Sequence, residues 1–100
     1  MRYVLADAAR TDLLEIWDYL AEHADLTVAD RVVDHLHAAM DKLAETPLIG
    51  HRREDLTEQP VRFWSVHSYL VVYDADATPI AVARVLHASR DLQAIIGDII

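Results

Sequence analysis

The chain has 100 residues, of which 53% are hydrophobic, and 17 acidic against 9 basic side chains give a formal net charge of −8. This length and apolar content predict one compact domain spanning residues 1–100. The absence of cysteine excludes disulfides and thiolate metal sites. Two glycines are too few for a Walker loop, a GxGxxG turn or a GxSxG nucleophile elbow. The acidic balance opposes direct DNA binding, which needs a cationic face.

The N-terminal apolar run is short and predicts no export or membrane insertion. Asp7 interrupts it too early for a secretory signal. No later run approaches the ~20 apolar residues that span a bilayer. We therefore expect a soluble, cytoplasmic protein without membrane contact.

The first half of the chain predicts a short strand followed by two helices. Residues 2–5 have strand character, and Asp7 is a candidate N-cap for a helix of four to five turns. Its apolar face is formed by Leu13, Ile16, Trp17, Leu20 and Ala24 at helical spacing.

The second helix is predicted to begin at a Thr27-x-x-Asp30 capping box and to end before Pro47 and Gly50. Its apolar stripe runs from Ala29 to Leu43. Because few residues separate the two helices, they should form an antiparallel hairpin.

From Pro60 onward, alternating and β-rich segments predict three strands over residues 61–66, 69–73 and 80–87. His67-Ser68 is a candidate tight turn, and the apolar third strand should lie centrally in the sheet. Ser89 is a candidate cap for a short terminal helix. The predicted fold class is α+β in the order β-α-α-β-β-β, with a helical hairpin packed on a small antiparallel sheet.

The six histidines do not predict a metal site, and no cofactor motif is present. His35 and His37 are two apart on a helix, so their side chains point roughly 200° apart around its axis. Neither an HExxH nor an HxxxH pattern occurs. We expect these histidines to be solvated or to lie at the edge of the core.

Basic residues on and after the predicted sheet form one candidate site for chemistry. Arg62, Arg84 and His87 are the residue types that hold a phosphate and protonate a leaving group, as in RNA cleavage. Arg62 and Arg84 should share a face, whereas Arg84 and His87 should face opposite sides unless a bulge intervenes. The alternative, favoured on the sequence, is that Arg62 pairs with a carboxylate of the hairpin and that Arg90 and Asp91 tie the last segment to the sheet.

Across nearly the whole chain, the order and spacing of residues resemble the ParE branch of the RelE/ParE toxins. The residues that carry the resemblance are Ala9, Asp12-Leu13, Ile16, Tyr19-Leu20, Ala29, Leu36, Leu43, Pro47, Gly50, Arg52, Arg62, Tyr69, Tyr73 and the run from Val85 to Asp91, which ends in His-x-x-Arg-Asp.

This resemblance implies a toxin of a type II toxin–antitoxin module that a ParD-like antitoxin holds inactive. ParE toxins act on DNA gyrase, whereas RelE, YoeB and HigB relatives cleave messenger RNA. Arg62, Arg84 and His87 fall near the functional positions of the RNase branch. However, the lysine-rich surface of RelE is missing, because Lys42 is the one lysine, and Ala88 replaces the tyrosine that follows histidine in YoeB. The ParE branch is the better match, so we expect action by binding; a degenerate member kept for antitoxin binding is a further alternative.

Apolar and aromatic side chains supply the expected binding surfaces. Trp17, Leu20 and Trp64 are the candidate antitoxin contacts, although both tryptophans also suit a helix–sheet core. The terminal segment supplies the candidate gyrase contacts Arg90, Leu92, Ile95 and Ile96. Packing of the sheet and helices does not obviously need these residues; the alternative is that the segment packs back on the sheet.

Overall fold

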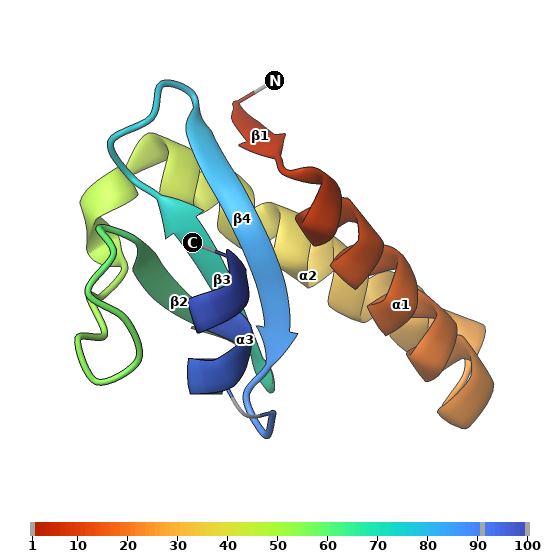
Figure 1. Cartoon of the computed structure of the whole chain (residues 1–100). Helices are drawn as coiled ribbons and strands as arrows, with labels where there is room; N and C mark the ends of the chain where they lie inside the picture. Colours follow the sequence, from red (N-terminus) through yellow and green to blue (C-terminus); the bar gives the residue numbers. More distant parts are fainter. Residues whose placement is uncertain (1, 91, 100) are drawn as a thin grey trace.

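The structure is a computed structural model that describes residues 2–90 and 92–99, and Figure 1 shows the arrangement of its elements. Two helices form a hairpin on one face of a four-stranded sheet, and a short third helix lies on the other face (Figure 1). The elements in chain order are β1 (Tyr3–Leu5), α1 (Asp7–His23), α2 (Leu26–Glu45), the 3₁₀ helix η1 (Pro47–Ile49), β2 (Arg62–Val66), β3 (Tyr69–Asp74), β4 (Ile80–His87) and α3 (Leu92–Ile99).

The α1–α2 hairpin is confirmed, but both helices begin differently from the prediction. Ala6 is the N-cap of α1 and makes no side-chain cap bond, while Asp7 lies in the first turn, where a carboxylate interacts favourably with the helix dipole. The cap of α2 is Asp25, whose side chain accepts a hydrogen bond of 2.8 Å from the Val28 amide. Asp25 therefore provides the cap that the sequence analysis assigned to Thr27.

The sheet has the strand order β1-β4-β3-β2, so β4 is internal as predicted. The pairs β2–β3 and β3–β4 are antiparallel, and His67 occupies a left-handed conformation (φ 53°) in the tight turn between β2 and β3. β1 instead pairs in parallel with β4, so the sheet is mixed and not purely antiparallel. The α1–α2 hairpin and the β2–β3 hairpin together form the long connection that a parallel pair requires.

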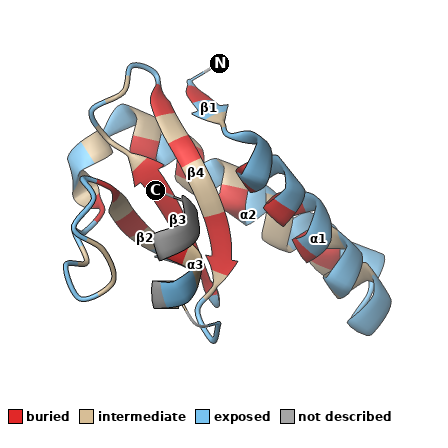
Figure 2. Ribbon diagram, in the orientation of Figure 1, coloured by how far each residue is buried: buried red, intermediate tan, exposed pale blue. Residues whose placement is uncertain are grey.

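Two hydrophobic cores lie on the two faces of the sheet. The larger core fills the space between the helical hairpin and the sheet, with fully buried Leu36, Met40, Leu43 and Tyr73 at its centre. The smaller core lies under α3, where Ile96 is fully buried beside Phe63, Leu70, Val72 and Leu86. Figure 2 shows the buried residues concentrated on the strands, which lie between the α1–α2 hairpin and α3.

Candidate functional site: a groove beside the end of β4

A groove of about 640 Å³ opens between α1 and the end of the sheet where β2 turns into β3. Its floor is apolar and its rim is polar. The lining residues are Asp12, Glu15, Ile16, Tyr19 and Leu20 of α1, Val32 of α2, His67, Ser68 and Tyr69 at the β2–β3 turn, Val85 and His87 of β4, and Ser89 and Arg90 beyond it.

A one-residue bulge in β4 shapes one wall of this groove. Val82 pairs with Tyr73, whereas Arg84 pairs with Val72, so Ala83 is left without a partner on β3. Because Ala83 precedes Arg84, the pairing is regular from Arg84 to His87, and these two positions alternate between the faces of the strand as expected.

Asp12 of α1 holds this bulge with three hydrogen bonds. Its carboxylate accepts from Arg84 Nε (2.7 Å) and Nη2 (2.9 Å), and from the backbone amide of Val85 (2.9 Å). The Asp12 side chain is only 6% exposed. The hydrogen bonds from Arg84 to Asp12 keep the pKa of the guanidinium above its ordinary value, against the opposing effect of partial burial.

His87 lines the groove, and its ring contacts Ser89 and Tyr69. The backbone amide of Ser89 donates to His87 Nδ1 over 3.1 Å, and Ser89 Oγ lies 2.6 Å from the same nitrogen. Because a backbone amide can only donate, Nδ1 is the acceptor in this contact. The ring packs edge-to-face on Tyr69, with centroids 5.2 Å apart.

The rim of the groove carries further polar groups. His67 Nε2 lies 2.7 Å from Nδ1 of His35, which connects the β2–β3 turn to α2. Tyr19 is largely exposed and stacks on His23. Arg90 forms no ion pair within residues 2–90. The alternative that Arg90 and Asp91 tie the last segment to the sheet depends partly on Asp91, which lies outside the described residues.

The structure does not bring the three candidate ribonuclease residues together. Arg62 Nη1 donates to the carbonyl of Gly50 over 2.8 Å, at the opposite end of the β2–β3 hairpin from the groove, and not to a carboxylate as expected. Arg84 is engaged by Asp12, and only His87 lines the groove. Arg62 and His87 pair with positions of β3 that are four residues apart, roughly 13 Å along the strand.

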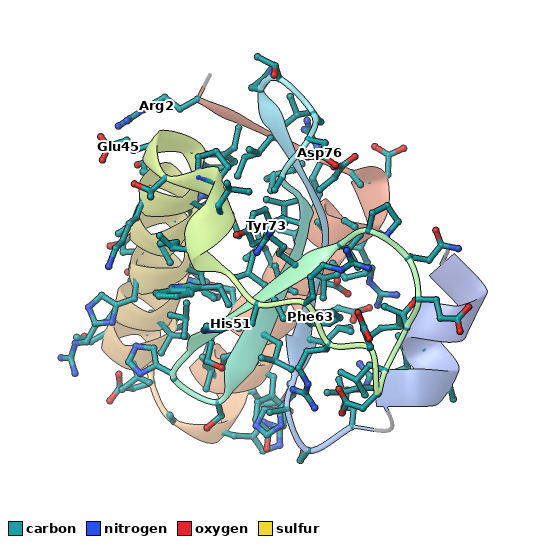
Figure 3. All side chains as sticks on the ribbon, turned by 90° about the vertical axis from the view of Figure 1, so that its left-hand side faces the viewer. Arg2, Glu45, His51, Phe63, Tyr73 and Asp76 are labelled. Carbon is teal, nitrogen blue, oxygen red and sulfur yellow. The ribbon has the colours of Figure 1, made fainter. Side chains whose placement is uncertain are left out.

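The three predicted antitoxin contacts are also separated, and only Leu20 lines the groove. Trp17 Nε1 donates to Asp30 over 2.9 Å, within the helical hairpin. Trp64 lies on edge strand β2, where Lys42 Nζ is 5.4 Å from its ring centroid and His51 packs beside it. Figure 3 shows His51 next to Phe63 at this edge.

The predicted gyrase contacts divide between two faces of the molecule. Arg90 lies on the groove rim, whereas Leu92, Ile95 and Ile96 belong to the core on the opposite face of the sheet. The expectation that these apolar residues are not needed for packing is therefore wrong. The sheet leaves an apolar second face, and α3 covers it.

Asp12 was named from the sequence only as part of the family resemblance, with no role of its own, and it is the one buried charged residue in the described part of the chain. A signal was present, because Asp12 falls three residues after Ala9 and four before Ile16, on the buried stripe of α1. An acid on an apolar stripe and an arginine in an apolar strand are the expected partners of a buried ion pair.

In residues 2–90 and 92–99 no three histidine, aspartate or glutamate side chains converge to hold a metal ion. In the same ranges no helix has the length and apolar character needed to cross a bilayer.

Two comparisons with known proteins show the family, and a third shows the fold. Residues 3–92 match the family model of the ParE toxin of the parDE type II toxin–antitoxin system. The chain is 32% identical over 92 residues to toxin ParE1 of Mycobacterium tuberculosis in two strains, covering 91% of this chain and 93% of the relative. A solved structure described as a chromosomal ParDE TA system from P. aeruginosa has a similar fold, with a TM-score of 0.74 at 18% identity over 89% of this chain and 97% of the other. The chain therefore belongs to the ParE family of type II toxin–antitoxin toxins.

Proposed function

We propose that this toxin arrests growth by binding DNA gyrase in the cytoplasm, and that a ParD-like antitoxin neutralises it by placing an apolar helical segment in the groove. The observation that carries the proposal is the groove itself, which joins apolar side chains from both layers of the fold. An amphipathic segment that enters such a groove buries its apolar face, which is a common mode of peptide recognition.

The chemistry of the lining supports an apolar partner segment with an acidic group near one end. Ile16, Leu20 and Val85 supply apolar contact area, and Tyr19 adds an exposed aromatic ring. Arg90 is the guanidinium on the rim that has no ion pair within residues 2–90. Because the toxin carries a net charge of −8, association should depend mainly on apolar burial and not on long-range attraction.

Two leucines of α1 provide a matched test of where the antitoxin binds. Leu20 lines the groove, whereas Leu14 is 68% exposed on the same helix and does not line it. We expect Leu20→Arg to abolish copurification with the protein encoded by the neighbouring gene, and Leu14→Arg to leave it intact. Equal loss in both variants, or in neither, contradicts a groove-bound antitoxin.

The hydrogen bonds that Arg62 and Arg84 make within the protein favour a toxin that acts by binding over one that cleaves RNA. Arg62 and Arg84 are hydrogen-bonded within the protein, so neither is free to hold a scissile phosphate beside His87. Of the gyrase contacts expected from the sequence, Arg90 remains a candidate, whereas the apolar residues of α3 do not because they pack in the core.

Induction of the toxin without its antitoxin tests the target. We expect growth arrest with an SOS response and loss of plasmid supercoiling while messages remain intact, and we expect the purified chain to inhibit supercoiling by purified gyrase. Message cleavage that His87→Ala abolishes would instead support the ribonuclease alternative. Antitoxin binding without any growth arrest would identify a degenerate member.

A further inference from the structure

The bulge in β4 determines which side chains face the groove. At Val82, β4 faces the helical hairpin, and alternation along a regular strand would next turn Arg84 and Leu86 to that face. The structure shows the opposite beyond Ala83. Val85 and His87 line the groove, and Leu86 lies in the core under α3. The extra residue therefore turns Val85 and His87 to the face that carries the groove, and Leu86 to the opposite face.

The bulge lies at the point where β4 loses a neighbouring strand. β1 pairs with β4 only as far as Val82, and the chain then leaves the sheet at Ala6, whose amide donates to the Val82 carbonyl over 2.9 Å. The Val85 amide beyond this point has no acceptor on β1. The buried carboxylate of Asp12 provides that acceptor and binds Arg84 next to the unpaired Ala83.

We infer that Asp12 is a positioning residue for the groove: its carboxylate fixes the β4 bulge and thereby turns Val85 and His87 toward the bound partner. That Asp12 fixes the bulge is the structural half of this inference. That this orientation serves partner binding is its functional half, which rests on the proposed role of the groove. Asp12 acts through the strand and not by touching the partner, because its carboxylate is nearly inaccessible and already accepts three hydrogen bonds.

Two matched variants separate this positioning role from a general contribution to folding. The first carries Asp12→Ala and Arg84→Val, which removes the contacts that hold the bulge but keeps Ala83. The second carries the same substitutions and lacks Ala83. Without that residue, a regular strand pairs Val82 with Tyr73 and Val85 with Val71, as in the natural chain. In the second variant, Val85 should therefore point toward the groove again although Asp12 is absent.

The first measurement uses the free chain and needs no partner. In the natural chain, NMR should show contacts between the Val85 and Val71 side chains, which pair across the strands on one face. We expect the first variant to lose these contacts and to gain contacts between Val85 and Leu70, and the deletion variant to restore them. Persistence of the Val85–Val71 contacts in the first variant overturns the inference.

The second measurement is the affinity for the protein encoded by the neighbouring gene. We expect about tenfold or greater weakening in the first variant, typical of losing a central interface contact, and affinity close to that of the natural chain in the deletion variant. If the deletion variant regains the Val85–Val71 contacts but not the affinity, Asp12 affects binding by another route, and the inferred role of Asp12 in partner binding is wrong. If the natural chain itself binds no partner, the proposed function fails, while the NMR result still decides the structural half.

Folding of the two variants is itself informative. If the first variant is unfolded and the deletion variant folds, the bulge is what required Asp12, which supports the inference. If neither folds, Asp12 and Arg84 are needed irrespective of the bulge, and the inference is overturned.

Discussion

The hydroxyl group of Tyr73 accepts a hydrogen bond of 3.0 Å from the backbone amide of Gly50 and thereby connects β3 to the segment that follows η1. The same hydroxyl donates to the carbonyl of Pro47 over 2.6 Å, and Arg62 donates to the Gly50 carbonyl. Tyr73 is fully buried, and Figure 3 shows it in the interior of the molecule. These contacts fix the return of the chain from α2 to the sheet.

We predict that Gly50→Ala destabilises the protein for lack of space. The backbone of Gly50 has an ordinary φ of −70°, so an alanine is not strained there. However, its Cβ would lie 2.3 Å from the Tyr73 hydroxyl oxygen and 2.7 Å from Cε1 of the buried ring. We expect a loss of about 1–3 kcal/mol in the free energy of unfolding, typical of overpacking. Urea denaturation measures this loss; an unchanged midpoint would show that the ring can move aside.

We predict a loss of stability at high pH to which Tyr73 contributes. Burial raises the pKa of Tyr73, with the Gly50 amide and Arg62 opposing, and burial also raises the pKa values of Tyr3 and Tyr69. Each tyrosine is therefore more easily ionised in the unfolded chain, where its pKa is about 10. Their stabilisation is complete below that pH and is lost as the pH rises through the folded-state pKa values.

Tyr73→Phe isolates the contribution of this residue. At neutral pH it should cost about 1–3 kcal/mol, because Pro47 and Gly50 lose a buried hydrogen-bond partner. Between pH 9 and pH 11.5, approximately spanning the tyrosine range, its unfolding free energy should fall less steeply than that of the natural chain. An identical slope would contradict the assignment.

The helices and the central strand were predictable from the sequence because periodicity directly reflects which face is buried. The stripe from Ala29 to Leu43 on α2 contains its four buried residues, and the apolar run of β4 indicated an internal strand. Caps were less predictable, because Asp25 and Thr27 are both good N-cap residues two positions apart. The parallel pairing of β1 leaves no local signal, since it depends on a contact between residues about 77 positions apart.

The candidate site was less predictable because it depends on contacts between elements distant in sequence. The sequence did not predict the bulge at Ala83, because a bulge has no reliable signature without a glycine. The partner that holds it, Asp12, is 72 residues from Arg84. The tail was misread because an apolar segment of eight residues can equally cover a sheet or contact a partner.

We predict that Arg62 contributes to stability and not to growth arrest. Its guanidinium donates to the carbonyls of Gly50 and, over 3.4 Å, Leu48. Arg62→Gln should lower the free energy of unfolding by about 1 kcal/mol and leave growth arrest intact at a temperature where the variant is folded. Circular dichroism confirms folding, and induction without the antitoxin measures arrest. Loss of arrest in a folded variant would favour the ribonuclease alternative.

The last prediction concerns Ile96, which the sequence indicated as a target contact and which the structure buries between α3 and the sheet. Ile96→Ala should lower the free energy of unfolding by about 2–5 kcal/mol, because it leaves a cavity against Phe63 and Leu86. Leu26→Ala, at an exposed position of α2, is the matched control and should cost little.

Stability and toxicity of the Ile96 variant distinguish packing from target contact. If Ile96 acts only in the core, toxicity should fall in proportion to the folded fraction, and a lower growth temperature or Ile96→Val should restore it. If Ile96→Ala stays folded and loses toxicity, Ile96 must leave the core to meet the target. That result would require α3 to detach from the sheet, exposing the apolar face that it covers.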